Sequence, residues 1–125
     1  MPSIDDLLET ARRRLRRVTP AEAFAEHRGG ALLIDTRTSE QRSRDGYIPG
    51  AVVIGRTVLE WRLDPASDSR IPEAATHEVR VIVICNEGYS SSLAAASLQD
   101  IGLINATDVI GGFEAWKAAR LPVRT

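Results

Sequence analysis

Hydrophobic and polar positions form two kinds of pattern along this chain. Short continuous apolar runs occur at residues 31–34, 51–54 and 79–84, and a weaker run at 107–110. Runs of this length, without alternation, are typical of strands that are buried on both faces of a sheet. The pattern therefore predicts strands in these four places.

Helical patterns lie before and between the runs. Apolar residues three and four apart predict a first helix over residues 4–18, with Ser3 as its N-cap. Thr19-Pro20-Ala21-Glu22 is a capping box with proline at the first helical position, so a second helix is expected from there to about residue 27. Further expectations are helices at 57–63, 90–101 and 113–119, and a loop at 64–76. Because strands alternate with helices, we expect an α/β fold with a mostly parallel sheet and helices on both faces.

Composition narrows the class of protein. The chain has 125 residues, of which 43% are hydrophobic and 26% are charged, as in an ordinary globular domain. No apolar run approaches the ~20 residues of a membrane span, and the start of the chain lacks the apolar core of a secretory signal. The formal net charge of −1 argues against a nucleic-acid binder. We therefore expect a cytoplasmic protein without nucleic-acid or membrane partners.

The cysteine count limits the candidate chemistry. Cys85 is the only cysteine, and His27 and His77 are the only histidines. A single cysteine excludes an intramolecular disulfide and a CxxC metal site. We expect no metal site and no cofactor.

Cys85 ends the strongest apolar run, VRVIVIC, and a loop and a helix follow it. Ligands of open α/β sheets bind beyond the carboxyl ends of the strands. Free N–H groups and the helix dipole favour an anion there, so they favour a thiolate. Gly88 permits the curled backbone that would turn these amides toward the sulfur. The alternative interpretation is a buried, inert cysteine.

Five arginines crowd the end of the first predicted helix: Arg12, Arg13, Arg14, Arg16 and Arg17. Cations are favoured at the C-terminal end of the helix dipole, so a solvated face is one interpretation and a patch for an anion or a partner is the other. The apolar stripe of the same helix packs either on its own domain or on a second copy. Both a monomer and a homodimer therefore remain open.

Four short motifs resemble the rhodanese-like domain family of sulfurtransferases. They are DTRTSE at 35–40, GYIPGA at 46–51, CNEGYSS at 85–91 and GGFEAW at 111–116. The likeness covers about residues 19–123. It implies a rhodanese-like domain over residues 19–125, preceded by an amphipathic helical extension over residues 1–18. It also implies that the parallel sheet has five strands.

The resemblance implies a sulfurtransferase without a cofactor. Cys85 would take a sulfane sulfur from a small-molecule or protein donor, form a persulfide, and pass the sulfur to a thiol acceptor. The loop around the persulfide would consist of Asn86, Glu87, Gly88, Tyr89, Ser90 and Ser91. Asp35, Arg37 and Glu40 would form a supporting ion network under this loop.

The loop departs from thiosulfate-active members of that family. Asn86 stands where those members often carry an arginine, and Ser90 stands where they often carry an arginine or a threonine. Glu87 adds a negative charge that opposes an anionic donor. We therefore expect thiosulfate to be a poor donor. Arg56 and Arg62 are candidate anion-binding residues because they lie near the ends of strands.

Two other functions come from different classes. The first is a non-catalytic binding or regulatory module with the same fold. The absence of cations from the loop favours this function, whereas the presence of Cys85 and Gly88 argues against it. A cysteine phosphatase needs an arginine at the end of the loop to clamp an oxyanion in a bidentate way. Ser90 and Ser91 stand at that place, which argues against a phosphatase.

Overall fold

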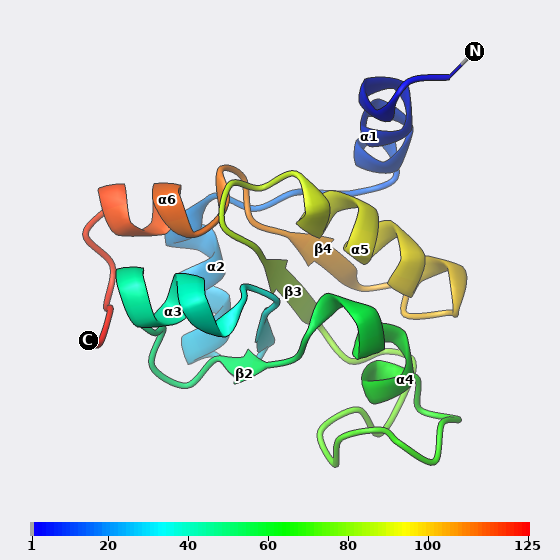
Figure 1. The fold of residues 1–125 in the computed structure, drawn as a ribbon. Coiled ribbons are helices and arrows are strands. Elements are labelled where there is room, and N and C mark those ends of the chain that lie inside the picture. Colours follow the sequence, from blue (N-terminus) through cyan, green and yellow to red (C-terminus); the bar gives the residue numbers. More distant parts are fainter. Residues whose placement is uncertain (1) are drawn as a thin grey trace.

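The centre of the molecule is a small parallel sheet surrounded by helices, as the computed structural model of residues 2–125 shows (Figure 1). Among residues 2–125, no helix combines the length and the apolar character needed to span a bilayer. The strands are β1 (Leu32–Asp35), β2 (Val52–Val53), β3 (Val81–Ile84) and β4 (Ala106–Asp108). The helices are α1 (Ile4–Arg13), α2 (Pro20–Arg28), α3 (Ser39–Asp45), the 3-10 turn η1 (Arg56–Val58), α4 (Leu59–Leu63), α5 (Ser90–Asp100) and α6 (Gly112–Ala118).

The sheet has the strand order β2-β1-β3-β4, and every pair is parallel. This confirms the expected α/β class, but the expected number of five strands is wrong, because the sheet has four. On the side of β4 away from β3, an isolated parallel bridge joins Val18 to Val109, the residue after β4. The pairing stops there because Thr19 caps α2 and Pro20 begins it, so the chain turns into a helix.

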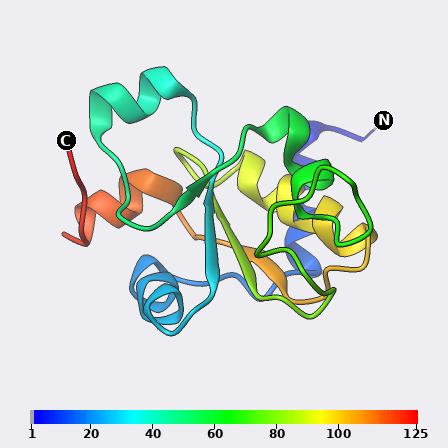
Figure 2. The same cartoon turned by 90° about the horizontal axis from the view of Figure 1, so that it is seen from below.

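The core lies on both faces of the sheet. Along β3, Val81 and Val83 face a cluster formed with α4 and α5, whereas Ile82 and Ile84 face a cluster formed with α2 and α6. Figure 2 shows these two groups of helices on opposite sides of the strands. Burial on both faces explains why β3 is a continuous apolar run.

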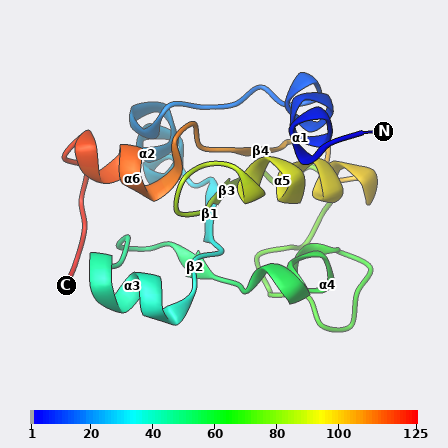
Figure 3. The same ribbon diagram turned by 45° about the horizontal axis from the view of Figure 1, so that its top comes forward.

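The first helix is shorter than the apolar spacing predicts. α1 ends at Arg13, and the chain then continues without helix to Val18, which donates its N–H to the carbonyl of Asp108 and accepts from Ile110. These sheet-like hydrogen bonds compete with continued helix, and they bring Leu15 into the core. α1 itself packs on α5 of the same chain (Figure 3). The division of the chain at residue 18 into an extension and a domain stays a prediction.

One helix was not expected from the apolar pattern. α3 buries none of its residues, so it carries no apolar period. It begins with a capping box in which Thr38 accepts from the N–H of Gln41 and Gln41 accepts from the N–H of Thr38. That box was the signal in the sequence that could have identified it.

Candidate active site

Cys85 follows β3 directly, four residues before the N-cap of α5. Its side chain is buried, with 6% of the residue exposed, and it borders a cavity of about 350 Å³. Because β1 and β3 are the central strands, this cavity lies at the carboxyl ends of the middle of the sheet. Most of the residues that line it have polar side chains: Thr36, Arg37, Thr38, Gln41, Cys85, Asn86, Glu87, Tyr89 and Ser90.

The sulfur of Cys85 lies where hydrogen-bond donors converge. The N–H of Gly88 donates to Cys85 Sγ at 3.2 Å. α1, α2 and α3 begin with side-chain capping boxes, but within the described part of the chain no side chain caps α5. No side chain competes for the amides at the start of α5, and the N–H of Ser91 is one of the groups that lower the pKa of Cys85.

These donors decide the charge of the thiol. Burial alone raises the pKa of Cys85. Hydrogen bonds from the hydroxyls of Ser91 and Ser90, and from the N–H groups of Ser91 and Gly88, more than offset burial, so the pKa is lowered from its ordinary value. The arrangement favours a thiolate, the form in which cysteine is a nucleophile.

Hydrogen bonds from α6 hold two carbonyl groups of the cysteine loop (residues 85–91) on the side away from the sulfur. The N–H of Phe113 donates to the carbonyl of Cys85 at 2.8 Å, and the N–H of Glu114 donates to that of Asn86 at 3.0 Å. This contact needs glycine at 112, where a Cβ atom would lie 2.5 Å from the carbonyl oxygen of Cys85. The GGFEAW motif therefore supports the cysteine loop from the start of α6.

Asp35 and Arg37 form a buried ion pair beside the cavity. Arg37 Nη2 lies 2.9 Å from Asp35 Oδ2 and also donates to the carbonyl of Gly46. Its guanidinium lies 3.6 Å from the centre of the Phe113 ring. Arg37 Nη1 and Asn86 Oδ1 are buried without a hydrogen-bond partner in the described chain.

Glu40 does not belong to the network predicted for it. It lies exposed on α3, and no ion pair joins it to another of residues 2–125. The reason is that α3 starts on the surface after Thr38, which turns its first residues away from the buried pair.

Arg56 and Arg62 also lie elsewhere, so the candidate anion-binding role assigned to them is not supported. Arg56 pairs with Glu60 one helical turn away, at 3.0 Å. Arg62 is exposed and donates to the carbonyl of Ser69. Glu87 lies exposed at the rim of the cavity, where water screens its charge.

Arg12, Arg17 and Asp108 contact the cysteine loop or its helix, and the sequence did not single them out. Arg12 and Arg17 both donate to the carbonyl of Gly88, and Asp108 accepts from Ser91. Neighbouring arginines in the same segment look alike in the sequence. No spacing or motif distinguishes the two that reach the loop.

Comparison with known proteins agrees with this geometry. The Rhodanese-like domain model matches residues 19–119. The thiosulfate sulfurtransferase GlpE of Haemophilus influenzae (strain PittEE) is 31% identical over 88% of this chain and 95% of its own length. GlpE of Pseudomonas savastanoi pv. phaseolicola is 33% identical over 82% and 88%.

A solved structure with a similar fold covers nearly all of the chain. It is a protein of unknown function from Rhodopseudomonas palustris CGA009, described as a possible tyrosine phosphatase. It has a TM-score of 0.89 and 32% identity, and the match covers 99% of this chain and 96% of that one. With the family model matching most of its length, this chain belongs to the rhodanese-like domain family.

Proposed function

We propose that this protein is a sulfurtransferase that carries sulfane sulfur as a persulfide on Cys85. One observation carries the proposal. The sulfur of Cys85 borders a polar cavity, receives a hydrogen bond from the N–H of Gly88, and stands at the start of a helix without a side-chain cap. Relatives that carry the name thiosulfate sulfurtransferase support it.

The first half-reaction loads the cysteine. The Cys85 thiolate attacks the outer sulfur of a donor R–S–S⁻, the donor S–S bond breaks, and R–S⁻ leaves with the bonding electron pair. The product is Cys85–S–S⁻, whose terminal sulfur carries the negative charge. Amide N–H groups that favour the thiolate also favour this anion, so no proton needs to be supplied.

The second half-reaction transfers the sulfur from the Cys85 persulfide to an acceptor. An acceptor thiolate attacks the terminal sulfur, and Cys85 leaves as the thiolate that the loop stabilises. Splitting the transfer into two displacements is the general logic of covalent catalysis. Because the chain has one cysteine, it cannot discharge the persulfide into an internal disulfide. The acceptor thiol is therefore external, and the need for a reduced free thiol is consistent with the cytoplasm.

The charges around the cavity bear on the donor. Among the lining residues that the structure describes, Arg37 is the single cation, and Asp35 neutralises it. Glu87 adds a negative charge at the rim. The dianion thiosulfate would therefore meet no free cation, so we propose a thiol persulfide as the better donor, because its reacting group carries one negative charge and not two.

Mass spectrometry of the whole protein tests the proposal. The chain is treated with glutathione persulfide or thiosulfate, excess donor is removed, and the intact mass is measured. We expect an added mass of about 32 Da, one sulfur atom, which is lost when a thiol acceptor is added. Cys85→Ser should show no adduct. If no donor gives an adduct on the native chain, the proposal fails and a non-catalytic binding module is favoured.

A phosphatase is the second function to test, because the R. palustris protein is described as a possible tyrosine phosphatase. Ser90 and Ser91 occupy the end of the loop, where a cysteine phosphatase needs an arginine to clamp phosphate. We expect no hydrolysis of an aryl phosphate. Hydrolysis that disappears in Cys85→Ser would replace sulfur transfer as the favoured function.

A further inference from the structure

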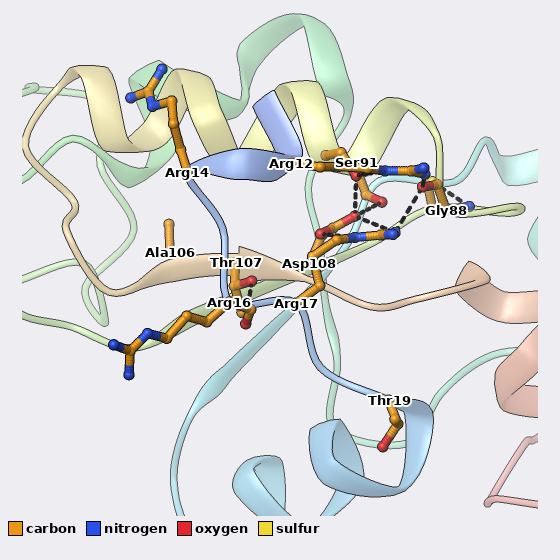
Figure 4. Close-up of polar contacts among 12 residues, drawn as sticks. Arg12, Arg14, Arg16, Arg17, Thr19, Gly88, Ser91, Ala106, Thr107 and Asp108 are labelled. Atoms are coloured by element: carbon orange, nitrogen blue, oxygen red, sulfur yellow. Dashed lines mark hydrogen bonds and ion pairs between the residues drawn. The ribbon is translucent and has the colours of Figure 1, made fainter. Parts of the chain in front are cut away.

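Two arginines near the start of the chain donate hydrogen bonds to the backbone of the cysteine loop. Arg12 lies in the last turn of α1 and Arg17 lies in the segment that leads to Val18. Nη2 of Arg12 donates to the carbonyl oxygen of Gly88 at 2.8 Å, and Nη2 of Arg17 donates to the same oxygen at 3.1 Å (Figure 4). Both residues precede the part of the chain that the family model matches.

Arg17 also neutralises a buried carboxylate. Its Nε lies 2.9 Å from Oδ1 of Asp108, and its Nη2 lies 3.2 Å from Oδ2. Asp108 is fully buried at the end of β4. The hydroxyls of Ser91 and Ser92 each donate to Oδ2 at 2.7 Å, and Arg12 Nε donates to Ser92 Oγ at 3.1 Å. The network thus joins both arginines to the first turn of α5.

Ser91 connects this network to the nucleophile. Its hydroxyl donates to Asp108 Oδ2 at 2.7 Å, and the same hydroxyl is a cause of the lowered pKa of Cys85, but it has only one proton to donate. Because Arg17 and Ser92 already satisfy Asp108, the Ser91 proton can turn to the sulfur when the sulfur is negative. Without Arg17 the buried carboxylate would keep that proton, since an unpaired buried charge is costly. Ser91 would then present only lone pairs to the sulfur.

The Gly88 carbonyl has a parallel role. The carbonyls of Cys85 and Asn86 are held outward by α6, and that of Gly88 is held outward by the two guanidinium groups. In a trans peptide the C=O and N–H bonds point in opposite directions, so each anchored carbonyl keeps the next N–H turned the other way. Anchoring on both sides restricts the peptide flips that would aim a carbonyl at the sulfur.

We propose that Arg12 and Arg17 are positioning residues, which set the reactivity of Cys85 through the Gly88 carbonyl, Asp108 and Ser91. This inference rests on the proposed function, in which the loop must hold a charged sulfur. The network contains the guanidinium groups of Arg12 and Arg17 and the carboxylate of Asp108, and Asp5 and Glu9 line a surface pocket together with Arg12. The other charged groups near Cys85 are Arg37, which is paired with Asp35, and the exposed Glu87.

The test measures how fast iodoacetamide alkylates Cys85 as a function of pH, with the single cysteine ensuring that only this site reacts. In Arg17→Gln and Arg12→Gln we expect the apparent pKa of alkylation to rise by about one unit, which lowers the rate at neutral pH up to tenfold. Arg13→Gln and Arg16→Gln are matched controls with the same change of charge. Both side chains are exposed, and Figure 4 shows Arg16 pointing away from Asp108.

If the apparent pKa of alkylation rises as much in the two control variants as in Arg12→Gln and Arg17→Gln, the cause is the change of net charge, and the proposal is overturned. The route through Ser91 has its own test. In a Ser91→Ala background, Arg17→Gln should shift the alkylation pKa less than it does in the native chain, because only the route through the Gly88 carbonyl remains. An undiminished shift would overturn the route through Ser91. Arg17→Gln leaves Asp108 unpaired and so risks a loss of folding. In that case the alkylation of Arg12→Gln tests the proposal, because Arg12 is half-buried and forms no ion pair with another described residue.

Alkylation needs no sulfur donor, so the two proposals fail separately. Persulfide formation on the native chain, with no shift in either arginine variant, would overturn the positioning role alone. A shift in both variants, with no persulfide from any donor, would overturn sulfur transfer while showing that the network controls the thiol.

Discussion

The backbone of Gly88 lies directly against the backbone of Gly111. A Cβ atom at Gly88 would lie 2.8 Å from the amide nitrogen of Gly111, closer than Cβ atoms of folded proteins approach a neighbour. Gly88 also has a φ of +87°, a conformation that side chains disfavour. The same conformation directs its N–H to the sulfur of Cys85. Glycine is therefore required here for packing and for backbone geometry.

Gly88→Ala should destabilise the fold and slow the chemistry together. Strain at this φ and the contact with Gly111 should reduce the free energy of unfolding by about 2–4 kcal/mol. Because relief of the contact moves the amide away from Cys85, alkylation at neutral pH should also slow. Urea unfolding and alkylation kinetics measure the two effects.

Alanine substitutions at two other glycines separate the effect of packing from the effect of backbone strain. Gly30 has a φ of +110° with open space around it, so Gly30→Ala should cost about 1 kcal/mol from backbone strain alone. Gly55 has open space and a φ of −62°, so Gly55→Ala should cost nothing. If Gly88→Ala costs no more than Gly30→Ala, packing against Gly111 is not a constraint.

The pH dependence of Cys85 should differ between the folded and the unfolded chain. Because the folded loop lowers the pKa of Cys85, native alkylation should reach half its maximal rate below the ordinary value of about 8.5. Between the two pKa values the unfolded chain binds more protons, so the free energy of unfolding should rise with pH there. This contribution is lost as pH falls through the folded pKa. Equal alkylation midpoints in buffer and in urea would contradict the lowered pKa.

Asp35→Asn should be strongly destabilising. It leaves the guanidinium of Arg37 buried without its carboxylate, which typically costs about 3–5 kcal/mol. Glu9→Gln is the control, because it breaks the ion pair of Glu9 with Arg13, in which both side chains are mostly exposed. Such pairs contribute little, so urea unfolding of the control should match the native chain. Equal losses in the two variants would refute a special role for the buried pair.

Glu87→Arg should improve the use of thiosulfate. Replacing a negative charge by a positive one at the rim of the cavity should raise kcat/KM for this dianion about five- to tenfold. Glu73→Arg makes the same change of charge on an exposed residue that does not line this cavity. Its kinetics should stay unchanged, and the gain at position 87 should shrink with added salt. A similar gain in both variants would mean that the charge of Glu87 does not select the donor.

Much of the fold was predictable because its signals are local. The run at residues 79–84 contains β3, and the N-cap at Ser3 and the capping box at Thr19 start the helices that they predict. α3 was missed because it buries no side chain. α1 was predicted too long, since apolar spacing continues to Val18 although the sheet takes Val18 out of the helix.

A buried run, a cysteine, a glycine and a helix start are neighbours along the chain, so the candidate nucleophile and its loop could be identified without a structure. The charges that surround them depend on contacts between distant parts of the chain. Arg17 and Asp108 are 91 positions apart and meet because β4 lies beside β3 and Val18 pairs next to it. Arg56, placed near the loop from its position after a strand, instead pairs with Glu60. Strand order and the path of the chain decide which long-range contacts form, and neither can be recognised from the residue type at any single position.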